Sequence, residues 1–114
     1  MKVIMQDTAH NSIDSCFDYL SHFSTKNAIE TIEGIYDIIY NLENSPFMGR
    51  YIPEMSDKRF RELIYRKHRN QGYRIVYYVS EFKETIYILY VANCKQDFNR
   101  ILKIHNYFSN YFKF

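Results

Sequence analysis

The segment from residue 59 to residue 91 constrains the fold most, because it contains three runs of strand-forming residues separated by turn chemistry. The first run covers residues 59–65, the second covers residues 73–79, and the third ends at Val91. The polar segments 66–72 and 80–84 separate the runs, and both fit hairpin connections. The segment therefore predicts a three-stranded antiparallel meander.

The second run has two largely apolar faces, since side chains alternate along a strand. One face consists of Tyr73, Ile75, Tyr77 and Val79, whereas the other presents Arg74 between apolar and aromatic neighbours. We expect a helix layer against one face and a partner or ligand against the other. Arg74 then lies at the centre of an accessible cationic wall.

Two helical patterns precede the meander. The first has apolar residues at three- and four-residue steps, namely Ile13, Cys16, Phe17, Leu20 and Phe23. The second runs from Lys26 to Leu42, with Ser24 or Thr25 as its N-cap and Pro46 after its end. Because the break between the two patterns is short, they predict an antiparallel αα-hairpin.

The remaining elements lie at the ends of the chain. Residues 2–6 predict an edge strand, with Asp7 or Thr8 as the N-cap of the first helix. Residues 45–54 predict a loop from the helices to the sheet. Asp97 is the expected N-cap of a last helix that reaches about Asn110. With 114 residues, the chain is expected to form a single α+β domain over residues 1–114.

Positive charge is concentrated on the expected sheet. The net charge is only +2, but residues 58–74 contain seven Lys or Arg against one acid, Glu62. Arginine both stacks on tyrosine and pairs with phosphate, so this face suits nucleic acid or an acidic protein segment. We expect the target-binding residues to be Arg59, Arg61, Arg66, Lys67, Arg69 and Arg74.

Other site classes receive no support from the sequence. Cys16 and Cys94 have neither CxxC spacing nor a ligand cluster around them, so we expect no disulfide, no metal and no cofactor. The N-terminus lacks the long apolar segment of a signal peptide, and no run approaches the roughly 18 apolar residues of a membrane span. A cytoplasmic protein without membrane contact is expected.

Several motifs occur together in one order. They are residues 46–54 with Pro46, Gly49 and Pro53, then residues 61–63, the strand 73–79, and the strand 86–91 followed by polar residues 93–97. In this combination the chain resembles the RelE/ParE superfamily of toxins from type II toxin-antitoxin modules. The resemblance covers most of the chain and implies neutralisation by a cognate antitoxin. It also implies one of two actions, the poisoning of DNA gyrase or the cleavage of mRNA on the ribosome.

The residues leave both actions open, with a slight preference for gyrase. Metal-independent RNA cleavage needs a base, an acid and positive charge for the phosphorane. For that reaction the resemblance implies Arg74, Arg61 and Lys95 as cations and His68 or Tyr107 as the acid-base group. The endonucleases usually have consecutive basic residues after the last strand, whereas Lys95 is followed by Gln96 and Asp97. A third alternative is an inactive homologue that only binds a partner helix.

Overall fold

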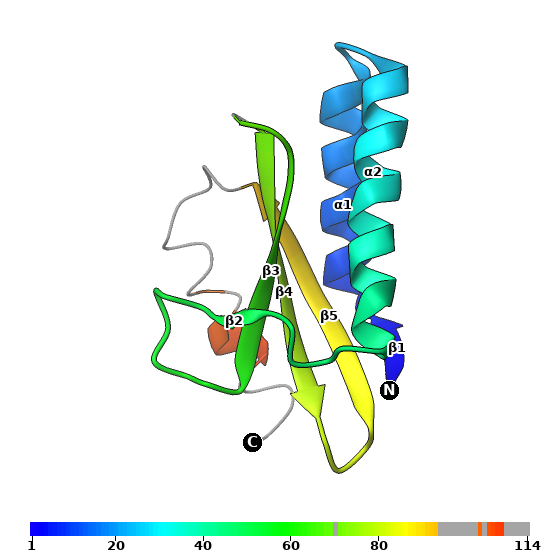
Figure 1. Ribbon diagram of the computed structural model, residues 1–114. Helices are drawn as coiled ribbons and strands as arrows, with labels where there is room; N and C mark the ends of the chain where they lie inside the picture. Colours follow the sequence, from blue (N-terminus) through cyan, green and yellow to red (C-terminus); the bar gives the residue numbers. More distant parts are fainter. Residues whose placement is uncertain (70, 94–102, 104, 109–114) are drawn as a thin grey trace.

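The computed structural model describes residues 1–69, 71–93, 103 and 105–108, and it shows a helical hairpin packed on one face of a five-stranded sheet (Figure 1). The helices are α1 (Asp7–Ser21) and α2 (Thr25–Tyr40), followed by a 3₁₀ turn, η1 (Asn41–Glu43). The strands are β1 (Lys2–Met5), β2 (Arg50–Tyr51), β3 (Phe60–His68), β4 (Gln71–Ser80) and β5 (Thr85–Asn93). Residues 103 and 105–108 are helical. The predicted α+β architecture is confirmed.

The strands follow the order β1-β5-β4-β3-β2. β3, β4 and β5 form the predicted antiparallel meander, and β1 is an edge strand that pairs in parallel with β5. Sequence analysis missed β2, a two-residue strand inside the predicted loop. The prediction that residues 66–72 form a turn was wrong, because cross-strand pairing continues through Arg66↔Gly72 and His68↔Gln71. The basic residues there extend the hairpin instead.

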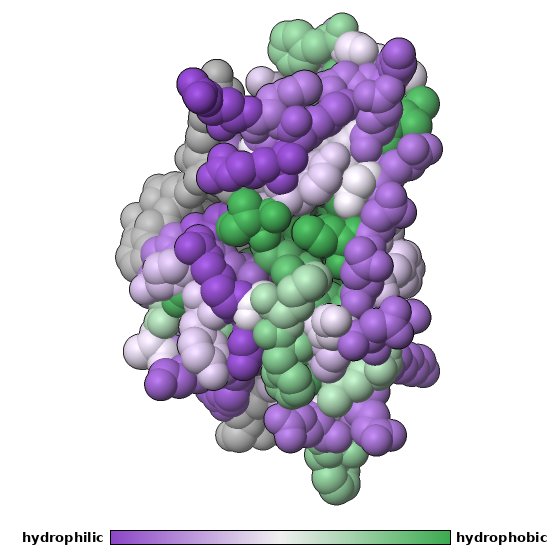
Figure 2. Space-filling model, in the orientation of Figure 1, coloured by the Kyte–Doolittle hydropathy of each residue, from purple (hydrophilic) through white to green (hydrophobic). Residues whose placement is uncertain are grey.

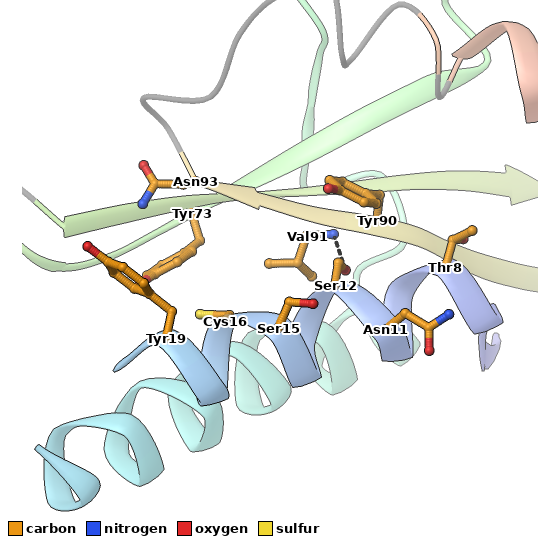
Figure 3. A pocket seen from close by; sticks show the side chains of 10 residues that line it. All are labelled: Thr8, Asn11, Ser12, Ser15, Cys16, Tyr19, Tyr73, Tyr90, Val91 and Asn93. Atoms are coloured by element: carbon orange, nitrogen blue, oxygen red, sulfur yellow. Dashed lines mark hydrogen bonds between the residues drawn. The ribbon is translucent and has the colours of Figure 1, made fainter. Parts of the chain in front are cut away.

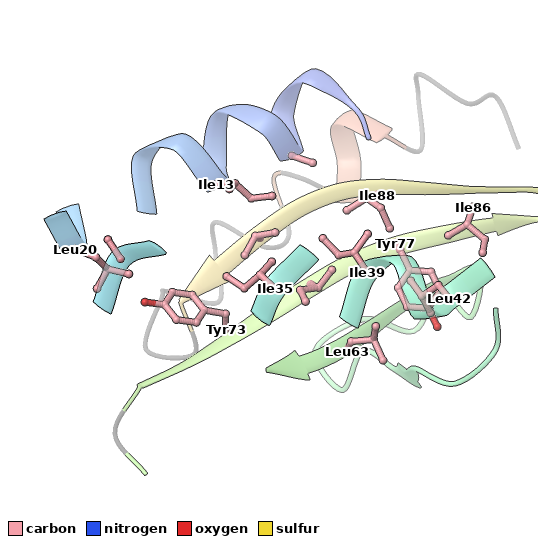
Figure 4. Packing of buried hydrophobic residues seen from close by; sticks show 14 residues of the cluster. Ile13, Leu20, Ile35, Ile39, Leu42, Leu63, Tyr73, Tyr77, Ile86 and Ile88 are labelled. Carbon is pink, nitrogen blue, oxygen red and sulfur yellow. The ribbon is translucent and has the colours of Figure 1, made fainter. Parts of the chain in front are cut away.

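The main core lies between the helical hairpin and the sheet (Figure 4). As expected, the face of β4 that carries Tyr73, Ile75 and Tyr77 packs against the helices. Burial of these apolar side chains is the main force that holds the two layers together. Phe23, predicted to belong to the core stripe, is instead exposed, because α1 ends at Ser21.

Helix caps explain where the helices begin. The predicted cap of α2 is confirmed, since Ser24 Oγ accepts a hydrogen bond of 3.1 Å from the backbone N–H of Asn27. The predicted cap of α1 was wrong, because Gln6 occupies that position without a side-chain bond. The hydroxyl of Thr8 instead donates to the carbonyl of Leu89 at 2.6 Å and so joins α1 to β5.

A second apolar cluster covers part of the opposite face of the sheet. It joins β3, β4 and β5 to the loop after β2 and to the C-terminal helical residues, which lie across the sheet from the hairpin (Figure 1). Its buried members are Ile52, Phe60, Val76, Leu89 and Phe108. None of the described helices is long and apolar enough to cross a membrane.

Candidate functional site

An ion-pair network lies on the sheet face opposite the helices. Alternation along β3 and β4 directs Glu62 and Arg74 to this face, and Arg74 Nε donates to Glu62 Oε1 at 2.7 Å. The other end of the guanidinium donates to both carboxylate oxygens of Glu54, one of them at 2.6 Å. Arg50 Nε donates to Glu62 Oε2 at 2.9 Å. Two arginines and two glutamates thus form one neutral cluster.

The network corrects the prediction for Arg74. Its side chain is buried and fully engaged by two carboxylates, so Arg74 is not the exposed centre of a cationic wall. The hydrogen bonds that Arg74 donates to Glu54 and Glu62 raise the pKa of Arg74 above its ordinary value, and the bond to Glu54 lowers the pKa of that carboxyl. A guanidinium held in this way fixes the loop to the sheet. Its first role is structural.

Two other predicted target-binding residues also have acidic partners within the chain. Arg59 pairs with Asp57, with Nε donating at 2.8 Å. The side chain of Lys67 extends from β3 to α2, where Nζ donates to Asn27 Oδ1 at 2.6 Å and to Glu30 Oε2 at 3.0 Å. Hydrogen bonds from Lys67 lower the pKa of Glu30. These contacts neutralise much of the charge that the sequence places on the sheet.

Arg61 clamps the loop that leads into β2. Nη1 donates to the carbonyl of Gly49 at 2.8 Å, and the guanidinium carbon lies 5.2 Å from the Phe47 ring centroid and 4.5 Å from that of Tyr51. The Nζ of Lys58 lies 5.7 Å from the same Tyr51 ring. Cation–π contacts of this kind hold rings and cations in fixed positions. The sequence placed Arg61 on the sheet but gave no signal for its aromatic partners.

Two predicted cations remain exposed and form no ion pair with any residue in the described ranges, namely Arg66 and Arg69. Arg66 lines an open cleft of about 570 Å³ beside the ion-pair network, together with Arg50, Pro53, Glu54, Ile64 and Arg74. His68 is exposed at the end of β3, close to both cations in the sequence. The exposed part of the predicted basic face therefore lies at the tip of the β3–β4 hairpin, while Arg61 is held against the loop before β2.

The predicted acid-base residues do not meet in one site. Tyr107 adjoins Phe108, which packs with Phe60 at the start of β3, whereas His68 lies at the other end of that strand. Eight residues of extended chain separate the strand's ends by about 26 Å. Lys95 falls outside the described residues. The structure thus does not bring His68 and Tyr107 together.

Sequence reasoning missed a polar contact that holds the C-terminal helical residues. His105 Nε2 lies 2.9 Å from Asp57 Oδ2, and its ring stands edge-on to Phe60 with centroids 5.0 Å apart. Hydrogen bonds from Arg59 and His105 hold the pKa of Asp57 well below its usual range. Glu62 did carry a signal, because it is the one acid among seven cations in residues 58–74 and precedes the apolar residues of its strand.

A pocket of about 430 Å³ lies between α1 and the end of β5 (Figure 3). Its wall combines tyrosine rings and Val91 with hydroxyl, amide and thiol groups, and none of the lining side chains carries a formal charge. Ser12 Oγ accepts a 3.0 Å hydrogen bond from the N–H of Val91. Because β1 pairs only with residues 85–88 of β5, α1 thus supplies an acceptor for a backbone amide that β1 does not reach. Burial raises the pKa of Tyr73 to about 12 and also raises the pKa of Cys16. Within the described residues, no group of His, Cys, Asp and Glu could hold a metal ion.

Comparison with known proteins gives one family. Residues 3–98 match the sequence profile of a family described as the ParE toxin of the type II toxin-antitoxin system parDE. Comparison with curated proteins found no match.

Three solved structures have a similar fold. A chromosomal ParDE toxin-antitoxin system from P. aeruginosa gives a TM-score of 0.63 at 17% identity, covering 82% of this chain and 95% of the other. A mutant of the E. coli toxin RelE in the free state gives 0.56 at 18% identity, covering 82% and 83%. The RelBE2 toxin-antitoxin complex from Mycobacterium tuberculosis gives 0.55 at 15% identity, covering 81% and 95%. At these identities the likeness establishes the fold alone.

Proposed function

Because the chain belongs to the ParE toxin family of type II toxin-antitoxin systems, we propose that it arrests growth by binding and poisoning DNA gyrase. A cognate antitoxin neutralises it. The protein acts in the cytoplasm, where its target lies. Such a toxin works by stoichiometric binding and needs a complementary surface rather than a catalytic group.

One observation carries the preference for binding over RNA cleavage. Arg74, the cation expected at the reaction centre, is occupied by Glu62 and Glu54. A cleaving site needs positive charge directed at the phosphorane, and a guanidinium with two carboxylate partners has little left to offer it. The two candidate acid-base residues, His68 and Tyr107, also lie at opposite ends of β3.

The exposed cations Arg66 and Arg69 are the residues that we assign to target binding. They lie at the tip of the β3–β4 hairpin and have no ion-pair partner in the part of the chain that the structure describes. Charges of this kind act mainly on the association rate and on the choice of partner. The same surface suits an acidic patch on a protein target.

RNA cleavage in the manner of RelE is the second candidate, supported by the cleft beside Arg66. This cleft of about 570 Å³ borders Arg50 as well, so a phosphate could meet two cations there. A ribosome-dependent endonuclease would use the cleft as its RNA site. Under the gyrase proposal, the cleft is not an RNA-cleavage site.

Induced expression in bacterial cells separates the two candidates. The gyrase proposal predicts filamentous cells, an SOS response and intact mRNA, whereas messages cut within codons would contradict it. In the same assay, Arg66→Ala/Arg69→Ala should weaken growth arrest. Lys83→Ala, which removes an exposed cation from the β4–β5 turn at the other end of the sheet, is the matched control and should leave growth arrest unchanged.

A further inference from the structure

The loop between α2 and β3 presents an apolar surface with fixed positive charge, formed by Phe47, Met48, Tyr51, Lys58 and Arg61, which we call the loop patch. We propose that the loop patch binds an acidic segment of the antitoxin that also carries apolar side chains. This inference rests on the proposed toxin function and adds the contact surface for the neutralising partner.

The apolar side chains of the patch are about half exposed and lie close together in the sequence. Phe47, Met48 and Tyr51 are 46%, 51% and 47% exposed, and all three lie within five consecutive residues. Figure 2 shows apolar surface running down the middle of this face, from between β3 and α2 to the segment that connects α2 to β2, with hydrophilic surface on both sides. Clustered exposed apolar side chains with a polar border are typical of protein interaction sites.

The patch is also held rigid before any partner arrives. Arg61 hydrogen-bonds the carbonyl of Gly49 at 2.8 Å and the hydroxyl of Tyr51 at 3.3 Å, while its guanidinium lies against both flanking rings. The N–H of Gly49 donates to the buried hydroxyl of Tyr77 at 2.8 Å. A surface that is already ordered loses little conformational entropy on binding, and Tyr and Arg are frequent binding hot spots.

The charge of the patch indicates an acidic partner. Lys58 and Arg61 lie against the exposed rings. The neighbouring acids are engaged elsewhere, Glu54 with Arg74 and Asp57 with Arg59 and His105. The patch therefore presents positive charge beside half-exposed rings. A partner segment with alternating acidic and apolar residues complements both features.

Binding of purified full-length protein to the full-length antitoxin encoded beside its gene tests the inference by calorimetry. Phe47→Ala/Tyr51→Ala and Lys58→Glu should each weaken binding at least tenfold, and Lys58→Glu should also reduce its salt dependence. Phe82→Ala and Lys83→Glu are the controls, since Phe82 is 96% exposed in the β4–β5 turn, and both should bind within twofold of the wild type. Arg61 is left intact because it holds the loop. Circular dichroism confirms that each variant is folded.

Two results would overturn the inference. One is antitoxin binding by the folded loop patch variants within twofold of the wild type, and the other is competition by RNA or DNA oligonucleotides that the patch substitutions abolish. Growth assays keep this outcome apart from the proposed function. Without antitoxin the loop patch variants should still arrest growth, and with antitoxin they should be rescued less well than the wild type. Failure of the wild type to arrest growth would count against the proposed function, while the calorimetric result still decides the patch.

Discussion

The Nε of Arg74 donates a 2.7 Å hydrogen bond to Oε1 of Glu62, a carboxylate whose side chain has no exposed surface. Removal of one partner from such a pair leaves a buried charge without compensation. The contact also joins neighbouring strands, because Glu62 lies on β3 and Arg74 on β4. Through Glu62 and Glu54, Arg74 joins β4 both to β3 and to the loop after β2.

Arg74→Ala should therefore lower the free energy of unfolding by roughly 3–5 kcal/mol, the usual cost of breaking a buried ion pair. The cause is that the buried Glu62 carboxylate keeps only the exposed Arg50 as a partner, while Glu54 loses the guanidinium that binds both of its oxygens. Urea denaturation followed by circular dichroism measures the change. Arg66→Ala, on an exposed cation, is the matched control and should stay within about 0.5 kcal/mol of the wild type. An Arg74→Ala protein as stable as the wild type would contradict the structural role.

Gly34→Ala should not give the stability that alanine usually adds inside a helix. A Cβ at position 34 would lie 2.1 Å from the hydroxyl of Tyr65, so the ring must leave α2. We expect the helix-propensity gain of about 1 kcal/mol to be cancelled or reversed. In a Tyr65→Ala background the same Gly34→Ala change should stabilise by up to about 1 kcal/mol. Equal effects in both backgrounds would show that the ring does not restrict this position.

Ser12→Ala should lower the free energy of unfolding by about 1–3 kcal/mol, because the amide of Val91 loses its acceptor. Hydrogen exchange at the Val91 amide should become faster in the same variant. Ser15→Ala removes an exposed hydroxyl one turn along α1 and serves as the control, with a change within about 0.5 kcal/mol. Unchanged exchange at Val91 would argue that the amide does not depend on this bond.

Acid should destabilise the protein partly through Asp57. The Arg59 guanidinium and His105 hold the pKa of this carboxyl far below its usual range, so the folded state keeps it ionised when the unfolded chain already takes up a proton. The stability from this group is complete above about pH 5 and is lost as the pH falls below about 4. Asp57→Asn should cost stability at pH 7 and cost less at pH 3, as measured by urea midpoints. The same deficit at both pH values would contradict this linkage.

The sequence predicted the elements well because periodicity records which residues are buried. The helical hairpin, the meander and the face of Tyr73 followed from spacing alone. The two-residue strand β2 could not be predicted, since it depends on pairing of Arg50 and Tyr51 with Glu62 and Arg61. Tertiary contacts with β3, rather than local strand propensity, determine that these two residues form a strand.

The site was predicted less well, because charge counts do not reveal partners. A run of cations from Lys58 to Arg74 indicated an open basic face, but the acids that neutralise it come from residues 30, 54, 57 and 62. Only Glu62 stood inside that run with any sign of a buried partner. Distances across the fold are needed to tell a paired arginine from a free one.

Purified protein in a supercoiling assay with DNA gyrase tests the central claim most directly. We predict that supercoiling is lost as the toxin approaches gyrase in concentration, and that mRNA in a translation mixture with ribosomes stays intact at the same dose. Gyrase that remains fully active under a large excess of folded toxin, together with mRNA cut on the ribosome, would contradict the account.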